Sequence, residues 1–400
     1  MQRLNVKWKG LAYTIALIFL AFSNEIEHGL GILLPFRKVI LYLFAIGLFF
    51  VTLLIKRQIE IPKNTTLKIL LIQYFYYVVV TLISCFYRQN QSIVANLITL
   101  QFSFIGFWVG WQMEKETRGE AAVLLKRVAF IIVLQMLILY ALNLSAGYDH
   151  NTFKPHLIIP IGKSNAIASI LLVCMCSLLS NKKNIITTFF CFLGVVMTLS
   201  NSGLVATCIV LVLIMLCEGI LTKKVVTRIF FGLFSLIILL GILSKMPVWN
   251  QLEIYFSRFS RTISVLLSDT SSVLQKTNGR SDLWNNAIFV FEAHPILGVG
   301  IGDYVLESGE VLGKTHNVVL QVGVWGGIIG ITIFGTLVYA LTQGGTGKRK
   351  ELFMCCLVGV FVQAMVEPTF FTPAFDFFFW LYVGTQKYAL QEDKENVSQE

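Results

Sequence analysis

The chain has few charged residues, which make up 14% of its 400 positions, while 56% are hydrophobic. A soluble globular domain contains about 25% charged residues. The composition therefore excludes a soluble enzyme and predicts a polytopic membrane protein. The basic segment 1–10 is followed by an apolar run without a small-residue cleavage site, so no removable signal peptide is expected.

Patterns typical of redox centres and metal sites are also missing. The eight cysteines lie in apolar segments without a CxxC pair, which predicts small buried side chains rather than disulfides or zinc ligands. The five histidines show no HxH, HxxxH or HExxH spacing, and there is no acidic DxD pair or Walker loop. We therefore expect neither a metal nor another cofactor.

Long apolar runs, by contrast, follow one another along most of the chain. A helix needs about 20 apolar residues to span a bilayer. The runs predict twelve spans, at residues 10–24, 36–55, 67–86, 92–113, 126–144, 157–180, 185–200, 203–221, 226–244, 316–342, 352–366 and 374–390. The predicted fold is an all-α polytopic membrane protein with one large extracytoplasmic loop.

The large loop divides the predicted fold into four parts. An N-terminal bundle of about nine spans covers 1–244, the loop covers 245–315, and three C-terminal spans cover 316–390. The remaining residues, 391–400, form a polar cytoplasmic tail that we expect to be disordered.

Two short helices are expected inside the large loop. Apolar residues at spacings of three and four over 249–266 predict an amphipathic helix at the membrane interface. A second helix is expected from Ser281 to about Ala293, because Ser281 suits an N-cap and Pro295 stops the helix.

The net charge of +10 comes mostly from Lys and Arg in short loops. Counting alternate loops from a cytoplasmic N-terminus places most of these cations on one side, as the positive-inside rule requires. Both termini are therefore predicted to be cytoplasmic and the large loop extracytoplasmic. This distribution does not resemble the basic surface of a nucleic-acid-binding protein, so no nucleic-acid partner is expected.

Two residues of this loop region suit chemistry on anionic substrates. Arg280 keeps its charge and offers a planar fork of donors that fits phosphate oxygens. His316, at the mouth of the tenth predicted span, can exchange protons near neutral pH. Each also has a plainer interpretation, as a solvated arginine or as a polar residue at a helix end, and spacing alone does not decide between them.

Other polar or flexible segments also need an explanation. The glycines of 298–302 follow no strand of a βαβ unit, so nucleotide binding is not predicted. They are expected instead to let the loop turn after Pro295 and pass close to a span or a ligand. Lys163, Asn165 and Glu367 lie near predicted outer span ends, where ionisable groups are costly and often mark a site; for Lys163 the alternative is interfacial snorkelling.

Taken in order, Arg280, Trp284, the Pro295-x-x-Gly-x-Gly turn and the pair His316-Asn317 are followed by glycines of the tenth span. This series resembles the O-antigen polymerase/ligase family of bacterial membrane glycosyltransferases. The twelve-span layout with a large, late outer loop is similar too, and it implies a GT-C-like fold. Residues 162–168 resemble the family's sixth-span segment, which contains an asparagine.

One departure from the family concerns a cation. Family members often have Ser-Arg or Ser-Lys at the start of the span that follows a short outer turn, whereas this chain has Ser202-Gly203. If that cation helps to hold a lipid diphosphate, another residue must replace it here. Lys163 is the first candidate and Arg88 the second.

The resemblance implies sugar transfer on the outer face of the bacterial cytoplasmic membrane. A glycan on a polyprenyl diphosphate would pass to the next lipid-linked repeat unit, which describes a polymerase for O-antigen or capsule. Arg280 would neutralise the leaving diphosphate, and His316 would orient or deprotonate the attacking hydroxyl. The implied substrate-binding residues are Lys163, Asn165, Asn317, Arg88 and Trp284.

Membrane lipids surround such a protein, and a chain-length regulator and a flippase are candidate partners. The first alternative function is a ligase that transfers the glycan to lipid A core or to protein, because the donor chemistry is the same. The second is a lipid-linked glycan flippase or another transporter. Transporters often show broken helices and midplane charges, whereas the charge here gathers at the predicted outer face.

Overall fold

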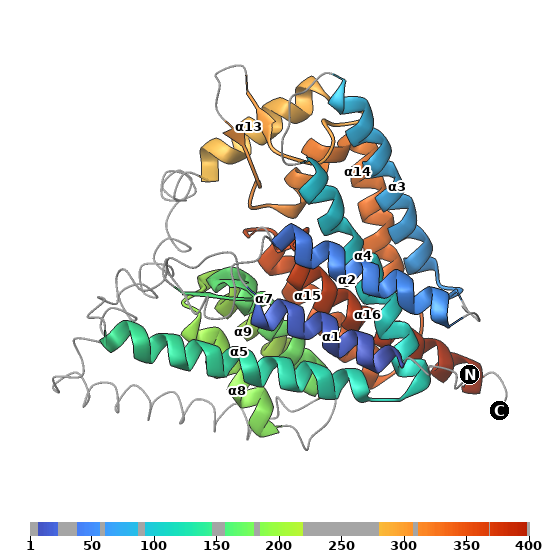
Figure 1. The fold of residues 1–400 in the computed structure, drawn as a ribbon, viewed down its shortest axis with the longest axis vertical. Helices are drawn as coiled ribbons and strands as arrows, with labels where there is room; N and C mark the ends of the chain where they lie inside the picture. Colours follow the sequence, from blue (N-terminus) through green and yellow to red (C-terminus); the bar gives the residue numbers. More distant parts are fainter. Residues whose placement is uncertain are drawn as a thin grey trace.

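The computed structural model describes residues 7–22, 38–56, 61–86, 93–145, 157–179, 185–218, 280–306, 311–367 and 369–397. Helices fill most of these segments (Figure 1). The helices that coincide with predicted spans are α1 (Trp8–Ala21), α2 (Lys38–Ile55), α3 (Thr65–Cys85), α4 (Ile93–Glu116), α5 (Glu120–Ser145), α7 (Ser164–Leu179), α8 (Ile185–Met197), α9 (Asn201–Cys217), α14 (Val318–Thr342), α15 (Lys348–Ala364) and α16 (Pro373–Val397). The predicted ninth span (226–244), the predicted amphipathic helix (249–266) and Arg88 lie outside the described residues.

The all-α class is confirmed for the described residues. Among the described residues, three helices are long and apolar enough to cross a membrane: α3, residues Glu120–Leu142 of α5, and α14. Several further apolar helices are shorter, among them α1, α7 and α9. Twelve crossings and a GT-C-like arrangement remain predictions.

Two predicted boundaries are wrong. The sixth span does not begin at residue 157, because β1 (Ile158–Ile159) and β2 (Gly162–Lys163) pair as an antiparallel hairpin and α7 begins only at Ser164. The tail is not disordered up to residue 397, because α16 continues as a helix to Val397. Side-chain pairs such as Gln391 with Glu395, four residues apart, support this extension.

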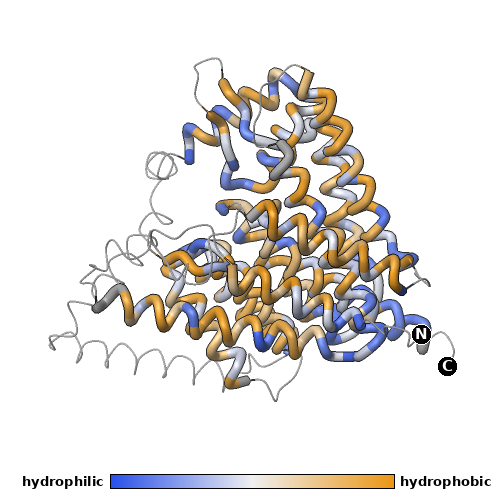
Figure 2. The backbone as a smooth tube through the Cα atoms, viewed as in Figure 1, coloured by the Kyte–Doolittle hydropathy of each residue, from blue (hydrophilic) through white to orange (hydrophobic). Residues whose placement is uncertain are grey.

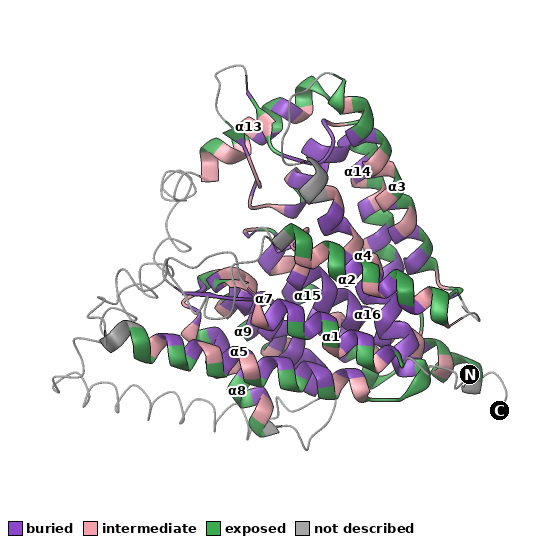
Figure 3. Ribbon diagram, in the orientation of Figure 1, coloured by how far each residue is buried: buried purple, intermediate pink, exposed green. Residues whose placement is uncertain are grey.

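The core is built on the close packing of α4 against α16 (Figure 3). Glycines make this approach feasible, since a Cβ atom at Gly106 would lie 2.5 Å from the backbone oxygen of Phe377. Gly384 faces the backbone of Phe107 in the same way. Small residues that let helix backbones approach closely are typical of membrane helix interfaces.

One end of the helix bundle, here called the basic end, gathers exposed charges. The end of α4 meets the start of α1 there, because Glu116 accepts from the backbone N–H of Trp8 and pairs with Lys56. The end of α16 joins them through an ion pair between Glu392 and Arg118. Hydrophilic segments gather at this end of the bundle, near the labelled N- and C-termini (Figure 2).

The opposite end, here called the site end, joins a different set of helix termini. Tyr140 near the end of α5 donates to the backbone oxygen of Met197 at the end of α8. Ser164 at the start of α7 donates to the oxygen of Thr198 at 2.5 Å. These contacts join different sets of helix termini at the two ends; the number of crossings and the compartment at each end stay predictions.

A kink in α14 is packed against residues 295–302, here called the glycine loop. At Gly327 the backbone leaves the helical conformation (φ 58°), so Ile328 N–H cannot bond to its own helix and donates to the oxygen of Pro295 at 2.8 Å. The carbonyl of Val324, freed by the kink, accepts from Val299 N–H at 2.9 Å. The loop therefore replaces hydrogen bonds that the helix has lost, as a buried helix break requires.

Close approach explains the glycines of that loop. Gly298 has φ +69°, and a Cβ atom there would lie 2.6 Å from the backbone nitrogen of Gly326. Tyr76 of α3 anchors the same turn by donating to the oxygen of Gly326 at 2.6 Å. The prediction that these glycines let the loop pass close to a span is confirmed.

Candidate functional site

Arg280 lies at the start of α13 (Arg280–Ala293), which confirms the short helix predicted in the large loop. The predicted N-cap is wrong, because Ser281 lies inside this helix. The helix ends just before Pro295, where the glycine loop begins. Trp284 turns its indole N–H toward the segment that precedes α14 and donates to the oxygen of Thr315 at 3.0 Å. This bond ties the helix that carries Arg280 to the residue next to His316.

The segment that carries His316 is fixed by bonds on both sides. Thr315 N–H donates to the side-chain oxygen of Gln321 at 2.7 Å. Asn317 is the N-cap of α14, accepting from the N–H groups of Val319 and Leu320, as capping asparagines do. Asn317, and not His316, therefore caps this helix.

His316 itself is held in a strained backbone conformation. Its φ is +54°, a value that non-glycine residues rarely adopt and that is often found at functional sites. Its neighbours supply the restraint: the hydroxyl of Thr315 donates to the oxygen of Asn317 at 2.8 Å, which closes a tight turn around His316. The turn places Nδ1 of the imidazole near Glu367, just after α15.

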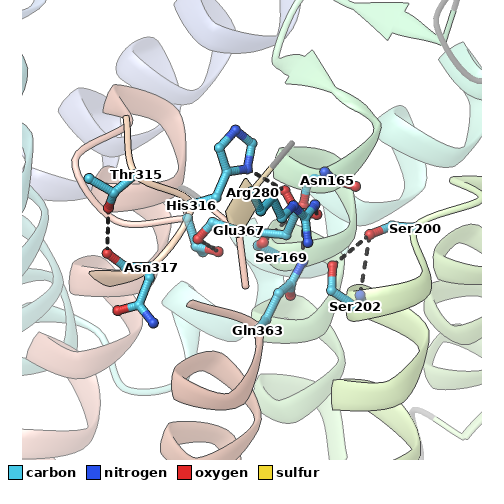
Figure 4. Close-up of polar contacts among 12 residues, drawn as sticks. Asn165, Ser169, Ser200, Ser202, Arg280, Thr315, His316, Asn317, Gln363 and Glu367 are labelled. Carbon is cyan, nitrogen blue, oxygen red and sulfur yellow. Dashed lines mark hydrogen bonds and ion pairs between the residues drawn. The ribbon is translucent and has the colours of Figure 1, made fainter. Parts of the chain in front are cut away.

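Glu367, just after α15, joins the two predicted catalytic residues (Figure 4). One carboxylate oxygen accepts from Nη2 of Arg280 at 2.6 Å, and the other lies 3.4 Å from Nδ1 of His316. The Glu367 side chain is only 5% exposed, against 29% for Arg280 and 33% for His316. A buried carboxylate thus lies between two partly exposed groups that can reach a substrate.

The charge state of Glu367 follows from this geometry. Burial opposes ionisation, but the contact with His316 and the positive charge of Arg280 outweigh it and hold the pKa of Glu367 below its ordinary value. Glu367 is therefore ionised at neutral pH. The carboxylate beside Nδ1 orients the imidazole and leaves Nε2 as the ring nitrogen that does not contact Glu367.

A small pocket of about 10 Å³ opens beside these groups. Its walls include His316 and Glu367 together with Lys314, Gln321 and Phe371. This volume is close to that of one water-sized oxygen. Nδ1 of His316 and the second carboxylate oxygen of Glu367 contact each other at 3.4 Å, whereas Nε2 of Gln321 is buried without a hydrogen-bond partner in the described part of the chain. Such an unsatisfied donor is rare in folded proteins, and Gln321 lines this pocket.

A second polar group lies at the start of α7. The fully buried amide of Gln363 donates to the backbone oxygen of Asn165 at 3.2 Å, and Glu367 N–H donates to the oxygen of Gln363. The side-chain oxygen of Asn165 is buried without a partner among the described residues. A single residue, Gln363, therefore connects Asn165 to the turn that carries Glu367. Asn165 lies near the same site (Figure 4).

The turn between α8 and α9 explains the missing family cation. A Cβ atom at Gly203 would lie 2.5 Å from Cβ of Ala168, so α9 could not pack on α7 with a long side chain at this position. Ser200 caps α9 by accepting from Gly203 N–H at 3.2 Å. The predicted replacement Lys163 is exposed on β2 and is not part of the pocket wall.

The structure therefore places Arg280, His316, Trp284 and Asn317 close together, while their roles in catalysis and substrate binding stay predictions. Glu367 was noticed as a polar site, but its role as the link between Arg280 and His316 was not predicted. The sequence argument missed Lys314 and Gln321 altogether. The position of Lys314, two residues before His316, was the only signal that could have drawn attention to it.

Residues 186–335 match the family model described as O-antigen ligase. The matched region begins in α8 and ends in α14, and it includes Arg280, Trp284, the glycine loop and His316. No curated protein matches the chain. The family match confirms the resemblance given by the sequence and supports a membrane enzyme of the glycosyltransferase type, acting in O-antigen or related polysaccharide synthesis.

Proposed function

We propose that the protein polymerises polyprenyl-diphosphate-linked oligosaccharide repeat units into a surface polysaccharide. The polymerisation reaction takes place at the site end, on the outer face of the bacterial cytoplasmic membrane, and both termini lie in the cytoplasm. The observation that carries the proposal is the buried Glu367 carboxylate between Arg280 and His316, in a chain whose residues 186–335 match the O-antigen ligase family model.

In this proposal the acceptor sugar brings a hydroxyl to His316. The hydroxyl oxygen attacks the anomeric carbon of the donor glycan, and its proton passes to the ring nitrogen that does not face Glu367. The ionised Glu367 stabilises the imidazolium that forms, and general base catalysis of this kind contributes about 100- to 10,000-fold. Transfer of the proton to solvent then regenerates the neutral imidazole.

The bond from the anomeric carbon to the diphosphate oxygen breaks in the same step. The leaving polyprenyl diphosphate takes the electron pair and gains negative charge. Arg280 has five N–H donors, and the bond to Glu367 that we describe uses only Nη2. The remaining donors suit the developing charge on the diphosphate, where preorganised donors act most strongly.

A ligase is the alternative function, because the matching family model is described as O-antigen ligase. The donor and leaving group would be unchanged, and only the acceptor hydroxyl would belong to lipid A core or to protein. The same three residues would carry out the same step.

Glycan analysis of a strain that lacks the gene separates these functions. Single repeat units accumulating on the lipid carrier support the polymerase. Full-length polymer retained on polyprenyl diphosphate supports the ligase and overturns the polymerase. Repeat units trapped on the cytoplasmic face would instead indicate the flippase alternative.

A further inference from the structure

Lys314 lines the same pocket as His316 and Glu367 but has no part in the step described above. Its ammonium group donates to the backbone oxygen of Phe371 at 2.9 Å, which holds the side chain across the loop that precedes α16. Phe371 is itself fixed, because its N–H donates to Asp376 at 3.2 Å and its φ is +63°. An ammonium has three donors, so two remain for a ligand.

Gln321, in the first turn of α14, supplies a second donor to this pocket. Its side-chain oxygen accepts from Thr315 N–H, which fixes the orientation of the amide. The other end of the amide, Nε2, is buried and has no partner in the described part of the chain. An unsatisfied buried donor is costly, and Gln321 lines a space the size of one oxygen.

A cation and a fixed amide donor select a negatively charged oxygen. The positive end of the α14 dipole lies at the same place and adds to this preference. Arg280 shares its charge with Glu367, so a second cation strengthens the attraction for an anion. Position 203, where the family often places one, is filled by the packing of α7 on α9.

We propose that Lys314 and Gln321 bind an oxygen of the diphosphate of the lipid-linked donor, so that Lys314 replaces the cation absent at Gly203. This inference rests on the proposed function for the identity of the ligand, but the anion site itself does not. Arg280 would hold the diphosphate from the side of α13, and Lys314 from the side of α16.

The protonation of Lys314 gives this site a pH dependence. Burial lowers its pKa to about 8, although the negative charges of Asp376 and Asp303 raise it. Across the pocket it faces His316 and Glu367. In the free protein the ammonium therefore loses its proton as the pH rises through about 8, and anion binding weakens. Lys314→Arg keeps its charge above that pH and removes this loss.

The test uses the purified full-length protein and inorganic pyrophosphate as the probe, with farnesyl diphosphate as a second ligand. Lys314→Met and Gln321→Glu are compared with Lys126→Met, a change at an exposed position of α5. Gln321→Glu keeps the acceptor for Thr315 and replaces the free donor with an anionic oxygen, so it tests the site without removing a structural bond. Both site variants should bind pyrophosphate on the order of 10- to 100-fold more weakly, and the control as tightly as the wild type.

Unchanged pyrophosphate affinity in a folded Gln321→Glu protein would overturn the proposal. So would an effect of Lys163→Met in place of Lys314→Met, which would move the replacement cation to β2. The proposed function is tested separately by glycan transfer from a lipid-diphosphate donor. If the wild type transfers glycan and both site variants bind pyrophosphate normally, only this inference fails. If the site variants lose pyrophosphate binding and the wild type transfers no glycan, only the proposed function fails.

Discussion

The two ends of the helix bundle use the same kinds of charged residue in different surroundings. At the basic end, Arg118 pairs with Glu392, and their side chains are 70% and 30% exposed. At the site end, Arg280 pairs with Glu367, and the exposed fractions are 29% and 5%. The first pair lies in solvent, whereas the second has lost most of its water.

This difference in burial indicates a difference in purpose. An exposed ion pair contributes about 0–1 kcal/mol, so the basic end gains little stability from its charges. A buried pair must overcome a desolvation cost and is weak evidence for stability. Charges kept in a dry pocket beside unpartnered polar atoms are typical of a functional site.

Replacing His316 should have the largest effect. His316→Ala removes the proposed base, so polymer formed per protein molecule should fall about 100- to 10,000-fold. Membrane-protein abundance and polymer length are measured in the same cells. His294→Ala, an exposed histidine beyond the end of α13, is the matched control and should keep normal polymer. Normal polymer from His316→Ala would remove the catalytic role.

Arg280→Lys should have the next largest effect. Lysine keeps the charge but loses the planar fork that serves Glu367 and the diphosphate together. Loss of a charged hydrogen bond predicts a decrease in transfer rate on the order of 10- to 100-fold. Arg118→Lys makes the same change at the basic end and should be silent; equal effects at both ends would mean that burial does not distinguish them.

A substitution in the glycine loop should lower the stability of the protein without a direct effect on the transfer reaction. Gly298→Ala puts a Cβ atom 2.6 Å from backbone atoms of α14 at a left-handed φ, so about 1–3 kcal/mol of strain should lower the amount of folded protein. Gly335→Ala, in the same helix, meets no atom within 4 Å and should be neutral or slightly stabilising. Abundance and thermal unfolding in detergent distinguish the two, and equal behaviour would contradict the close packing.

Glu367 should make a smaller, pH-dependent contribution to stability. Its folded pKa is below its ordinary value, so the stabilisation is fully present above the ordinary pKa of a glutamate and is lost as the pH falls through the folded pKa. Wild-type protein should therefore lose more stability than Glu367→Gln on acidification. Parallel pH profiles of thermal unfolding would show that Glu367 has no special charge state.

Hydropathy predicted most described helices because each coincides with an apolar run, although several of these helices are shorter than a span. It failed at 157–163, where Pro160 and Gly162 interrupt a run that is still apolar, so a hairpin and a helix look alike by composition. It also failed at the end of α16, where polar residues that form helices well resemble a disordered tail.

Part of the site was predictable because order along the chain identifies Arg280 and His316. Their common partner was not, because Glu367 lies 87 residues from Arg280 and only the folded chain brings the two together. The sequence does not show that the ammonium group of Lys314 donates to the backbone oxygen of Phe371. Contacts of this kind depend on tertiary packing that no spacing in the sequence reveals.

The most direct test of the central claim is a double-mutant cycle for glycan transfer with His316→Ala, Glu367→Gln and both together. If Glu367 acts through His316, Glu367→Gln should slow the wild-type protein on the order of 10- to 100-fold but add less than about twofold to His316→Ala, because groups that act as one unit are not additive. Rate losses that multiply in the double variant would contradict the account, since Glu367 and His316 would then act independently.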